Sequence, residues 1–429
     1  MIRHSPHDQA VSRHGWGRAV GTAVAGTIAM GVVAALGLWA AGASDLPEGA
    51  FPRLVAATFV TAVGGTVEVS GDAGGLAATR AGLTVMPLSV ALVGALVVGA
   101  GFLRPLRRRA VASAAELAGW AARIAVVWLL VVLGAALAAH RTFALPLGDD
   151  TLNDLGELFG VGPEAGFTTD VPLTLVSGAV WLAGVFVAAL LVSRSAPLPT
   201  RLLRLQESVR PAAHAMIVLL LACVAVGVLV ALVVAATRGR PAETFAVVLL
   251  GMPNVVWPVF TIGLGATWNG RVEGPFALPM PHVLDEVLRG PDTARLNLST
   301  LAEHDGRVWW LIVVDAVLVS AAALLTAAHS PARTRPWRHA LRTAVALVVT
   351  VLMICLTCRI SAHYGLSVLG LGDLGGGLSG RLLLRPELWS ALGAAALWGL
   401  VAGLPAGPAV EALRRRNGTR TRRRRAPSD

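Results

Sequence analysis

Three residues inside long apolar stretches have the types and positions that could handle an ion or a polar substrate within a membrane: Asp315, Asn254 and Pro253. A carboxylate such as that of Asp315 costs at least about 2.5 kcal/mol at membrane depth, so it should face a partner or a water-filled cavity. Pro253 removes a backbone donor from its apolar run. Asn254 and the carbonyls freed beside it could bind a substrate or ion, as discontinuous helices do in transporters.

Each of these residues also has a structural interpretation, which the sequence leaves open. Asp315, in VWWLIVVDAVLV, could pair with a helix dipole or with a hydroxyl of a neighbouring helix. Asn254 could cap a half-helix or satisfy the backbone groups at the break. We therefore treat a substrate or ion pathway through Asp315, Asn254 and Pro253 as a hypothesis.

Other residues with chemical potential favour plain interpretations. Arg123 stands near the start of its apolar run, where its side chain can snorkel to the membrane surface. Cys355 and Cys358, spaced as CLTC in an apolar segment, are more typical of packing than of redox chemistry. His304 and Asp305 form an isolated pair, which is a weak catalytic signal. We expect no catalytic residue, metal ligand or cofactor, because no Walker loop, HExxH or GxSxG sequence occurs.

The composition is that of a polytopic membrane protein. Apolar residues make up 55% of the 429 residues and charged residues only 14%, with a mean hydropathy of +0.68. The net charge of +11 comes from arginine alone, because the chain has no lysine. This bias and the abundance of Ala, Gly and Val suggest a GC-rich bacterial genome. The arginines flank apolar runs and so indicate how these runs are oriented in the membrane. We therefore expect no nucleic-acid partner.

The apolar segment 245–267, FAVVLLGMPNVVWPVFTIGLGAT, decides the topology. It is long enough to cross a bilayer, but Pro253 and Pro258 break its helix, so it either crosses with a bend or turns back. If it turns back, the cytoplasmic side holds 23 arginines and five acidic residues, and the outer side holds 12 arginines and 19 acidic residues. This distribution favours a re-entrant segment.

The sequence thus predicts an all-α integral membrane protein with about eight transmembrane helices and one broken or re-entrant segment. We expect a basic cytoplasmic tail (1–18), a polytopic membrane domain (19–410) and an Arg-rich cytoplasmic tail (411–429). The predicted spans are Ala19–Ala41, Leu83–Leu103, Ala118–Ala139, Val171–Val192, Ala215–Ala236, Val308–Ala328, Ala344–Cys358 and Leu388–Gly407. Both termini are predicted to lie in the cytoplasm of a multi-pass cell-membrane protein.

Small Gly-rich hairpins are predicted outside the cytoplasm. Val67–Ser70 alternates and precedes GDAGG, a turn signal, and GDLGG recurs at 372–376. MPLS at 86–89 is similar to VPLT at 171–174, so these echoes indicate either helical hairpins in parallel relation or chance recurrence in a biased composition. The stretch 281–306 contains an amphipathic segment, with Val283, Leu284, Val287 and Leu288 on one face.

VEVSGDAGGL followed by LTVMPLSVALVGALVVGAGFLRPLRR, and LLGMPNVVWPVFTIGLGATW followed by PMPHVLDEVL, resemble the streptophobe family of actinobacterial membrane proteins. The resemblance covers most of the chain and rests on glycine, proline and leucine patterns. It implies a membrane location and a many-helix architecture. It transfers no catalytic or binding residue, because the family has no established activity.

Two functions remain open. One is transport or permeation, based on Asp315 and on the break at Pro253 and Asn254; the other is a non-transporting membrane scaffold or assembly factor. An enzyme is less favoured, because no acid, base or metal cluster is apparent. The expected partners are the lipid bilayer and, through the Arg-rich C-terminus, anionic lipid headgroups; the sequence identifies no protein partner.

Overall fold

The computed structural model describes residues 6–45, 49–73, 77–106, 114–139, 141–144, 163–193, 200–239, 241–273, 294–330, 335–368 and 380–424. In these residues nine helices are long and apolar enough to cross a membrane. They are α1 (Pro6–Ala40), α3 (Leu88–Leu106), α4 (Ala114–Ala139), α6 (Val171–Val192), α7 (Thr200–Arg238), α8 (Pro241–Gly263), α11 (Trp310–Ala328), α12 (Pro336–Thr357) and α13 (Leu388–Arg424).

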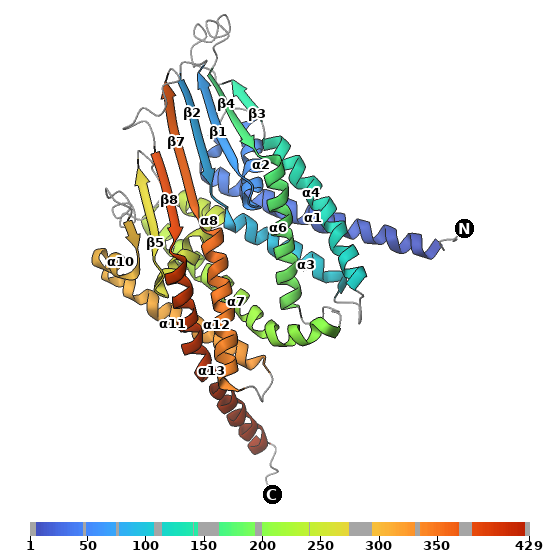
Figure 1. The fold of residues 1–429 in the computed structure, drawn as a ribbon, viewed down its shortest axis with the longest axis vertical. Helices are drawn as coiled ribbons and strands as arrows, with labels where there is room; N and C mark the ends of the chain where they lie inside the picture. Colours follow the sequence, from blue (N-terminus) through green and yellow to red (C-terminus); the bar gives the residue numbers. More distant parts are fainter. Residues whose placement is uncertain are drawn as a thin grey trace, which may run out of the picture.

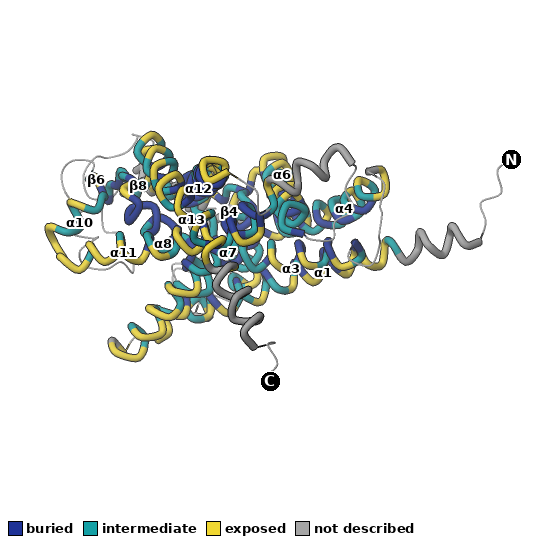
Figure 2. Tube along the Cα trace, turned by 90° about the horizontal axis from the view of Figure 1, so that it is seen from below, coloured by how far each residue is buried: buried dark blue, intermediate teal, exposed yellow. Residues whose placement is uncertain are grey.

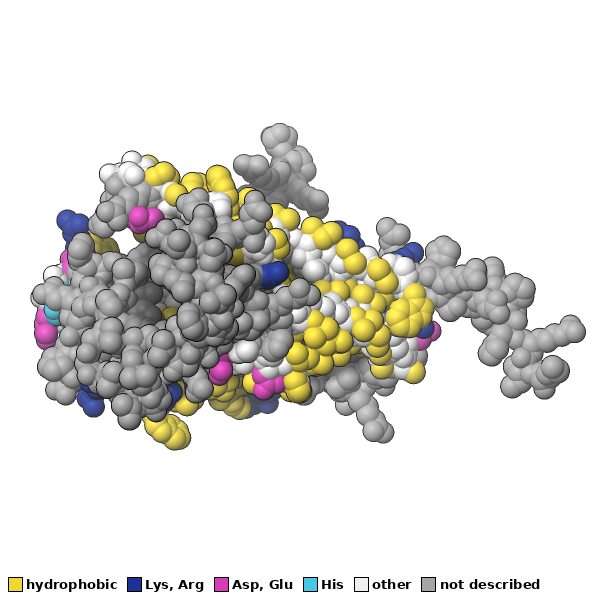
Figure 3. Space-filling view, turned by 90° about the horizontal axis from the view of Figure 1, so that it is seen from above, with side chains coloured by type: hydrophobic (Ala, Val, Ile, Leu, Met, Phe, Trp, Pro, Cys, Tyr) yellow, Lys and Arg dark blue, Asp and Glu magenta, His cyan; other side chains and the backbone are white. Residues whose placement is uncertain are grey.

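These helices expose apolar side chains in a way that only lipid accommodates. The exposed fractions of Leu130, Val180 and Leu229 are 63%, 67% and 64%, and the outward faces of the bundle are exposed along their length (Figure 2). Seen from the sheet end, the described flank of the bundle is mostly hydrophobic (Figure 3). A water-soluble protein rarely exposes apolar surface on this scale. The chain is therefore an integral membrane protein.

Each of the eight predicted spans overlaps a long helix, but the span predicted at Leu83–Leu103 starts five residues too early, because Leu83 and Thr84 lie in a β-strand and the helix begins at Leu88. The span predicted at Ala344–Cys358 belongs to α12, which begins eight residues earlier at Pro336 and is thus long enough to cross. The segment 245–267 forms most of α8 and the turn after it. One further apolar helix, α2 (Ala50–Ala62), was not predicted from the sequence and has only 13 residues.

One antiparallel sheet caps one end of the helical bundle (Figure 1). Its strands are β1 (Val67–Ala73), β2 (Ala77–Thr84), β3 (Arg141–Ala144), β4 (Pro163–Thr169), β5 (Trp268–Glu273), β6 (Ala294–Leu296), β7 (Ile360–Val368) and β8 (Gly380–Pro386). The order is β3-β4-β1-β2-β7-β8-β5-β6. The predicted hairpin at 67–75 is the β1–β2 pair, but the sheet is much larger than the small hairpins expected.

The two halves of the chain repeat the same succession of elements. The run α1, α2, β1, β2, α3, α4, β3, β4, α6 is followed by α7, α8, β5, β6, α11, α12, β7, β8, α13. The sheet order repeats as well, as β3-β4-β1-β2 and then β7-β8-β5-β6. In the described residues three short helices have no counterpart in the other half: η1 (Ala43–Asp45), between α1 and α2, and α10 (Leu298–His304) and η2 (Gly306–Trp309), between β6 and α11.

The strand registers support this correspondence. Val67 of β1 lies opposite Thr169 of β4, two residues before α6 begins. Trp268 of β5 lies opposite Pro386 of β8, two residues before α13 begins. The two halves are therefore parallel repeats, an arrangement known from membrane transporters.

A sequence trace of the repeat lies in α2 and α8. Residues 52–66, PRLVAATFVTAVGGT, align with 253–267, PNVVWPVFTIGLGAT. Gly64 and Gly265 match and both have a left-handed backbone, with φ of +89° and +104°, a conformation that favours glycine. The similar sequences at GDAGG and MPLS do not mark this repeat. The β1–β2 hairpin, which contains the start of GDAGG, corresponds to β5–β6 in the second half. The segment 372–376, which contains GDLGG, lies outside the described residues.

Candidate functional site

The helix α8 is broken at Gly251, next to Pro253. Gly251 has non-helical backbone angles, with φ of −139° and ψ of 17°. Pro253 has no N–H to donate to the carbonyl four residues before it, which opens the helix at this point. The sequence correctly predicted a break near Pro253, and the backbone groups at that break need partners inside the protein.

Ser89, in the first turn of α3, supplies two of these partners. Its hydroxyl donates to the carbonyl of Val248 over 2.9 Å and accepts from the N–H of Met252 over 3.1 Å. In a regular helix that N–H would donate directly to that carbonyl. The Ser89 hydroxyl is thus inserted into the hydrogen-bond ladder of α8, a recognised cause of kinks.

Asn254 makes the reciprocal connection from α8 to α3. Its side-chain Nδ2 donates to the carbonyl of Met86 over 2.8 Å, and its Oδ1 accepts from the N–H of Leu88 over 3.0 Å. Leu88 is the first residue of α3, where helical N–H groups lack partners within the helix. Asn254 therefore caps α3, a different helix, instead of capping half of its own segment or satisfying the break; a role in substrate binding stays a prediction.

Asp315 lies in α11 and is 3% exposed. Its carboxylate packs against Gly263, the last residue of α8, so closely that a Cβ atom at Gly263 would collide with Oδ2. Oδ2 has no hydrogen-bond partner in the described part of the chain. The helices α7, α8 and α11 pack on one another around this position. The structure thus contains a buried carboxylate with an unsatisfied oxygen.

The end of α8 beside Asp315 is held firmly. The N–H of Ala266 donates to the carbonyl of Thr261 over 2.9 Å across the left-handed Gly265. The hydroxyl of Thr261 accepts from the indole of Trp268 over 2.8 Å, and the indole of Trp398 donates to the carbonyl of Leu264 over 3.0 Å. The turn that faces Asp315 is therefore fixed by β5 and α13.

The predicted site residues fall into two separate places. Pro253 and Asn254 lie at the contact with α3, whereas Asp315 meets α8 at Gly263, ten residues further along, or about 15 Å at the helical rise. Ser89 and Gly263 were not predicted as functional residues. A serine following Met86–Pro87 at the start of an apolar run was a usable signal for Ser89; Gly263 offered none.

The remaining residues considered in the sequence have local roles. The carboxylate of Asp305 accepts from the N–H of Arg307 over 2.9 Å, and Nδ1 of His304 lies 3.0 Å from the carbonyl of Thr300. Both contacts are typical of helix ends. The guanidinium of Arg123 lies against Gly15 of α1, at the end of the bundle away from the sheet, as a snorkelling arginine would.

Fold and site together define an integral membrane protein with a broken helix and a buried carboxylate. Comparison with known protein families, with curated proteins and with solved structures finds no match for this chain.

Proposed function

We propose that the chain crosses the cell membrane eight times, that α8 is re-entrant, and that the sheet is extracytoplasmic. Between β4 and β5 the chain forms α6, α7 and α8, leaving the sheet and returning to it. If the sheet lies on one side of the membrane, an even number of these three helices must cross. One of the nine long apolar helices therefore does not cross.

The contacts of α8 favour it as the helix that does not cross. Its first half packs through Leu250 against Gly37, three residues before the end of α1, and through Val248 against Ser89, at the start of α3. Its last residue leads into β5 of the sheet. The first half of α8 thus contacts the sheet-side ends of α1 and α3, and its second half leads back to the sheet.

Exposed tryptophans support the same membrane placement. Trp39, Trp310 and Trp389 lie at helix ends that adjoin the sheet side and are 65%, 68% and 87% exposed. Trp16, at the start of the apolar part of α1 (Gly15–Ala40), and Trp337, at the start of α12, lie away from the sheet and are 46% and 52% exposed. Trp16 and Trp39 are 23 residues apart, about 35 Å along α1, which suits aromatic belts at the two surfaces of a bilayer. The arginine-rich tails and loops then lie in the cytoplasm.

Within this topology we infer a role in ion-coupled transport or permeation, with Asp315 as the group that takes up a proton or a cation. The observation that carries this inference is the buried, unsatisfied Oδ2 of Asp315. An ionised carboxylate without a partner at membrane depth is costly, so a proton or cation must neutralise it. Reversible neutralisation of such a carboxylate is the property that ion-coupled transporters use.

Proton flux through the purified protein tests this role. In proteoliposomes with an imposed pH gradient and an internal pH dye, we expect the wild-type protein to dissipate the gradient faster than protein-free liposomes. Asp315→Asn should slow this flux at least tenfold. Glu303→Gln, at an exposed position in α10, is the matched control and should keep it. Equal fluxes through the wild type and Asp315→Asn would remove Asp315 from the pathway.

A membrane scaffold or assembly factor is the second candidate. It is favoured by the extensive sheet and by the break in α8, whose exposed backbone groups are bound by Ser89 instead of facing a cavity. Absence of flux through the wild-type protein, together with loss of a co-purified protein after deletion of Gly71–Gly75, would support the scaffold over the transporter.

We also propose that the chain belongs to the streptophobe family of actinobacterial proteins, on the glycine, proline and leucine patterns around Gly71 and Pro253. The Arg-rich C-terminal tail, 411–429, is proposed to contact anionic headgroups of the cytoplasmic leaflet. Neither proposal assigns an enzymatic activity.

A further inference from the structure

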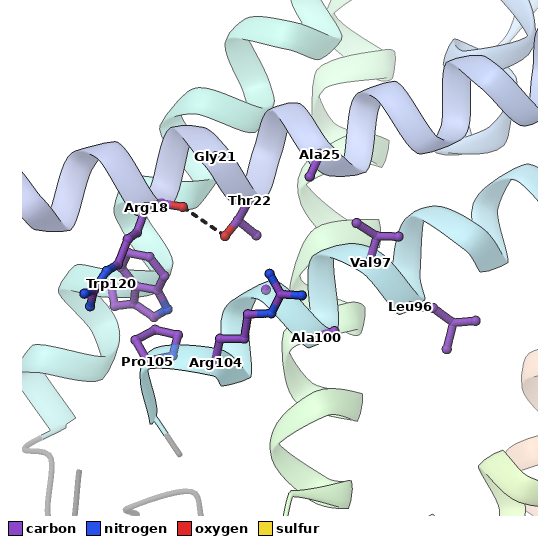
Figure 4. A pocket seen from close by; sticks show the side chains of 11 residues that line it. Arg18, Gly21, Thr22, Ala25, Leu96, Val97, Ala100, Arg104, Pro105 and Trp120 are labelled. Carbon is purple, nitrogen blue, oxygen red and sulfur yellow. Dashed lines mark hydrogen bonds between the residues drawn. The ribbon is translucent and has the colours of Figure 1, made fainter. Parts of the chain in front are cut away.

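A groove of about 870 Å³ lies between α1 and α3, at the ends of these helices away from the sheet. Arg18 and Gly21 line it from α1, Leu96 and Arg104 from α3, and Trp120 from α4. Figure 4 shows Arg18, Pro105 and Trp120 at one end and the guanidinium of Arg104 pointing from α3 toward α1. The lining thus combines two cations with an otherwise largely apolar wall.

The two arginines are available to an external anion. Arg18 and Arg104 are both exposed, and neither guanidinium is paired with a carboxylate in the part of the chain that the structure describes. Three more arginines follow Arg104 in the sequence, at 107–109. The two exposed guanidiniums therefore make one end of the groove positive, with no paired carboxylate among the described residues.

The rest of the groove is shaped for a hydrocarbon chain. From Arg18 to Ala25 it extends about 10 Å along α1, toward the membrane interior. Its floor is closed where α1 and α3 touch, because Gly101 packs against Thr22 and Gly26 against Val98. Gly21 faces open space, with no atom within 4 Å of a Cβ placed there. This opening comes from a missing side chain, flanked by the apolar side chains of Ala25 and Leu96.

We propose that this groove binds one anionic phospholipid of the bilayer. The phosphodiester lies between Arg18 and Arg104, and one acyl chain follows Gly21 and Ala25 along α1. Two guanidiniums match a phosphate group, and the apolar wall below them matches a lipid and not a free phosphate ion. With the N-terminus of α1 in the cytoplasm, the lipid belongs to the inner leaflet. The site is independent of Asp315 and of transport.

Lipid titrations followed by native mass spectrometry of the full-length protein in detergent test the charged end. We expect phosphatidylglycerol to bind more tightly than phosphatidylcholine, and millimolar inorganic phosphate not to displace it. The Arg18→Gln/Arg104→Gln double variant should bind phosphatidylglycerol about thirty-fold more weakly, the factor expected for two charges near the membrane surface. Arg335→Gln, an exposed arginine at the start of α12 and outside the groove, is the matched control and should bind normally.

Gly21→Leu tests the apolar part, because it fills the groove and leaves both arginines in place. It should weaken phosphatidylglycerol binding at least tenfold, whereas Gly31→Leu, also in open space on α1, should not. Helix stability should not suffer, because leucine favours helices over glycine. Normal phosphatidylglycerol binding by either the Arg18→Gln/Arg104→Gln double variant or Gly21→Leu would rule out the groove as the lipid site. Displacement of phosphatidylglycerol by phosphate, or equal affinities for phosphatidylglycerol and phosphatidylcholine, would rule it out as well.

Discussion

The hydroxyl of Ser89, in α3, completes the backbone hydrogen bonding of another helix, α8. It takes the place of one helical hydrogen bond of α8, between Val248 and Met252. In the other direction, Asn254 of α8 caps the first residue of α3. Because both exchanges occur at a buried contact, the carbonyl of Val248 and the N–H groups of Met252 and Leu88 gain partners that lipid could not supply.

Ser89→Ala should destabilise the protein by about 1–3 kcal/mol, the cost of leaving buried backbone groups without partners. Thermal unfolding of the purified protein in detergent measures this loss as a lower midpoint. Ser320→Ala removes the same hydroxyl from an exposed position of α11 and should leave the midpoint within error. An equal effect of both substitutions would show that Ser89 does not hold the break together.

Single residues differ in how far the sequence reveals them. Asp315 and Pro253 stand out, because a carboxylate or a proline in an apolar run is unusual wherever it packs. Ser89 is harder to recognise: its place after Met86–Pro87 marks a helix start, but its partner Val248 is 159 residues away. The same holds for Gly263, whose importance depends on the carboxylate of another helix.

At the scale of elements, α8 has the length and composition of a membrane span, but its first half contacts the sheet-side ends of α1 and α3. Length and hydropathy predicted the long helices well, because lipid imposes the same demand on every span. They failed for α2, which has too few residues to cross, and for the start of α12, where PWRHALR is too polar to signal a span. The alignment of 52–66 with 253–267 makes α2 the counterpart of the second half of α8 in the first repeat.

Sidedness of single cysteines tests the placement of α8. In a background without Cys223, Cys355 and Cys358, we expect Ala242→Cys, at the start of α8, and Arg295→Cys, in β6, to react with a membrane-impermeant maleimide from outside intact cells. Both residues are exposed. Arg335→Cys should react only after permeabilisation. Labelling of the two α8-flanking positions from opposite sides would mean that α8 crosses.

At the scale of the molecule, the sheet joins the two repeats. β2 of the first half pairs with β7 of the second over eight residue pairs, from Ala77–Val368 to Thr84–Ser361. A rocking motion of one half against the other would have to break this pairing, so movement in the membrane is expected within each half or in α8. The sequence predicted the local β1–β2 hairpin from alternation and a turn, but it holds no comparable signal for pairing between distant strands.

A disulfide between Thr84→Cys and Ser361→Cys tests this junction, because directly opposed strand residues are close enough to bridge. In the same cysteine-free background, with a protease site inserted within 194–199, oxidised protein should remain one species after cleavage and separate into two on reduction. Thr84→Cys with Leu383→Cys, two strands away, or about 10 Å, is the control and should separate without reductant. Identical behaviour of both pairs would contradict the sheet order.

The mutual contact of Ser89 and α8 also implies an order of assembly. Synthesis proceeds from the N-terminus, so α3 emerges and enters the membrane before α8 is made. A broken helix released into lipid would expose backbone groups without partners, at a cost of several kcal/mol each. Here the acceptor surface on α3 is in place beforehand. The first repeat can therefore act as a template during biogenesis, because it binds α8, a segment that would insert unfavourably into lipid by itself.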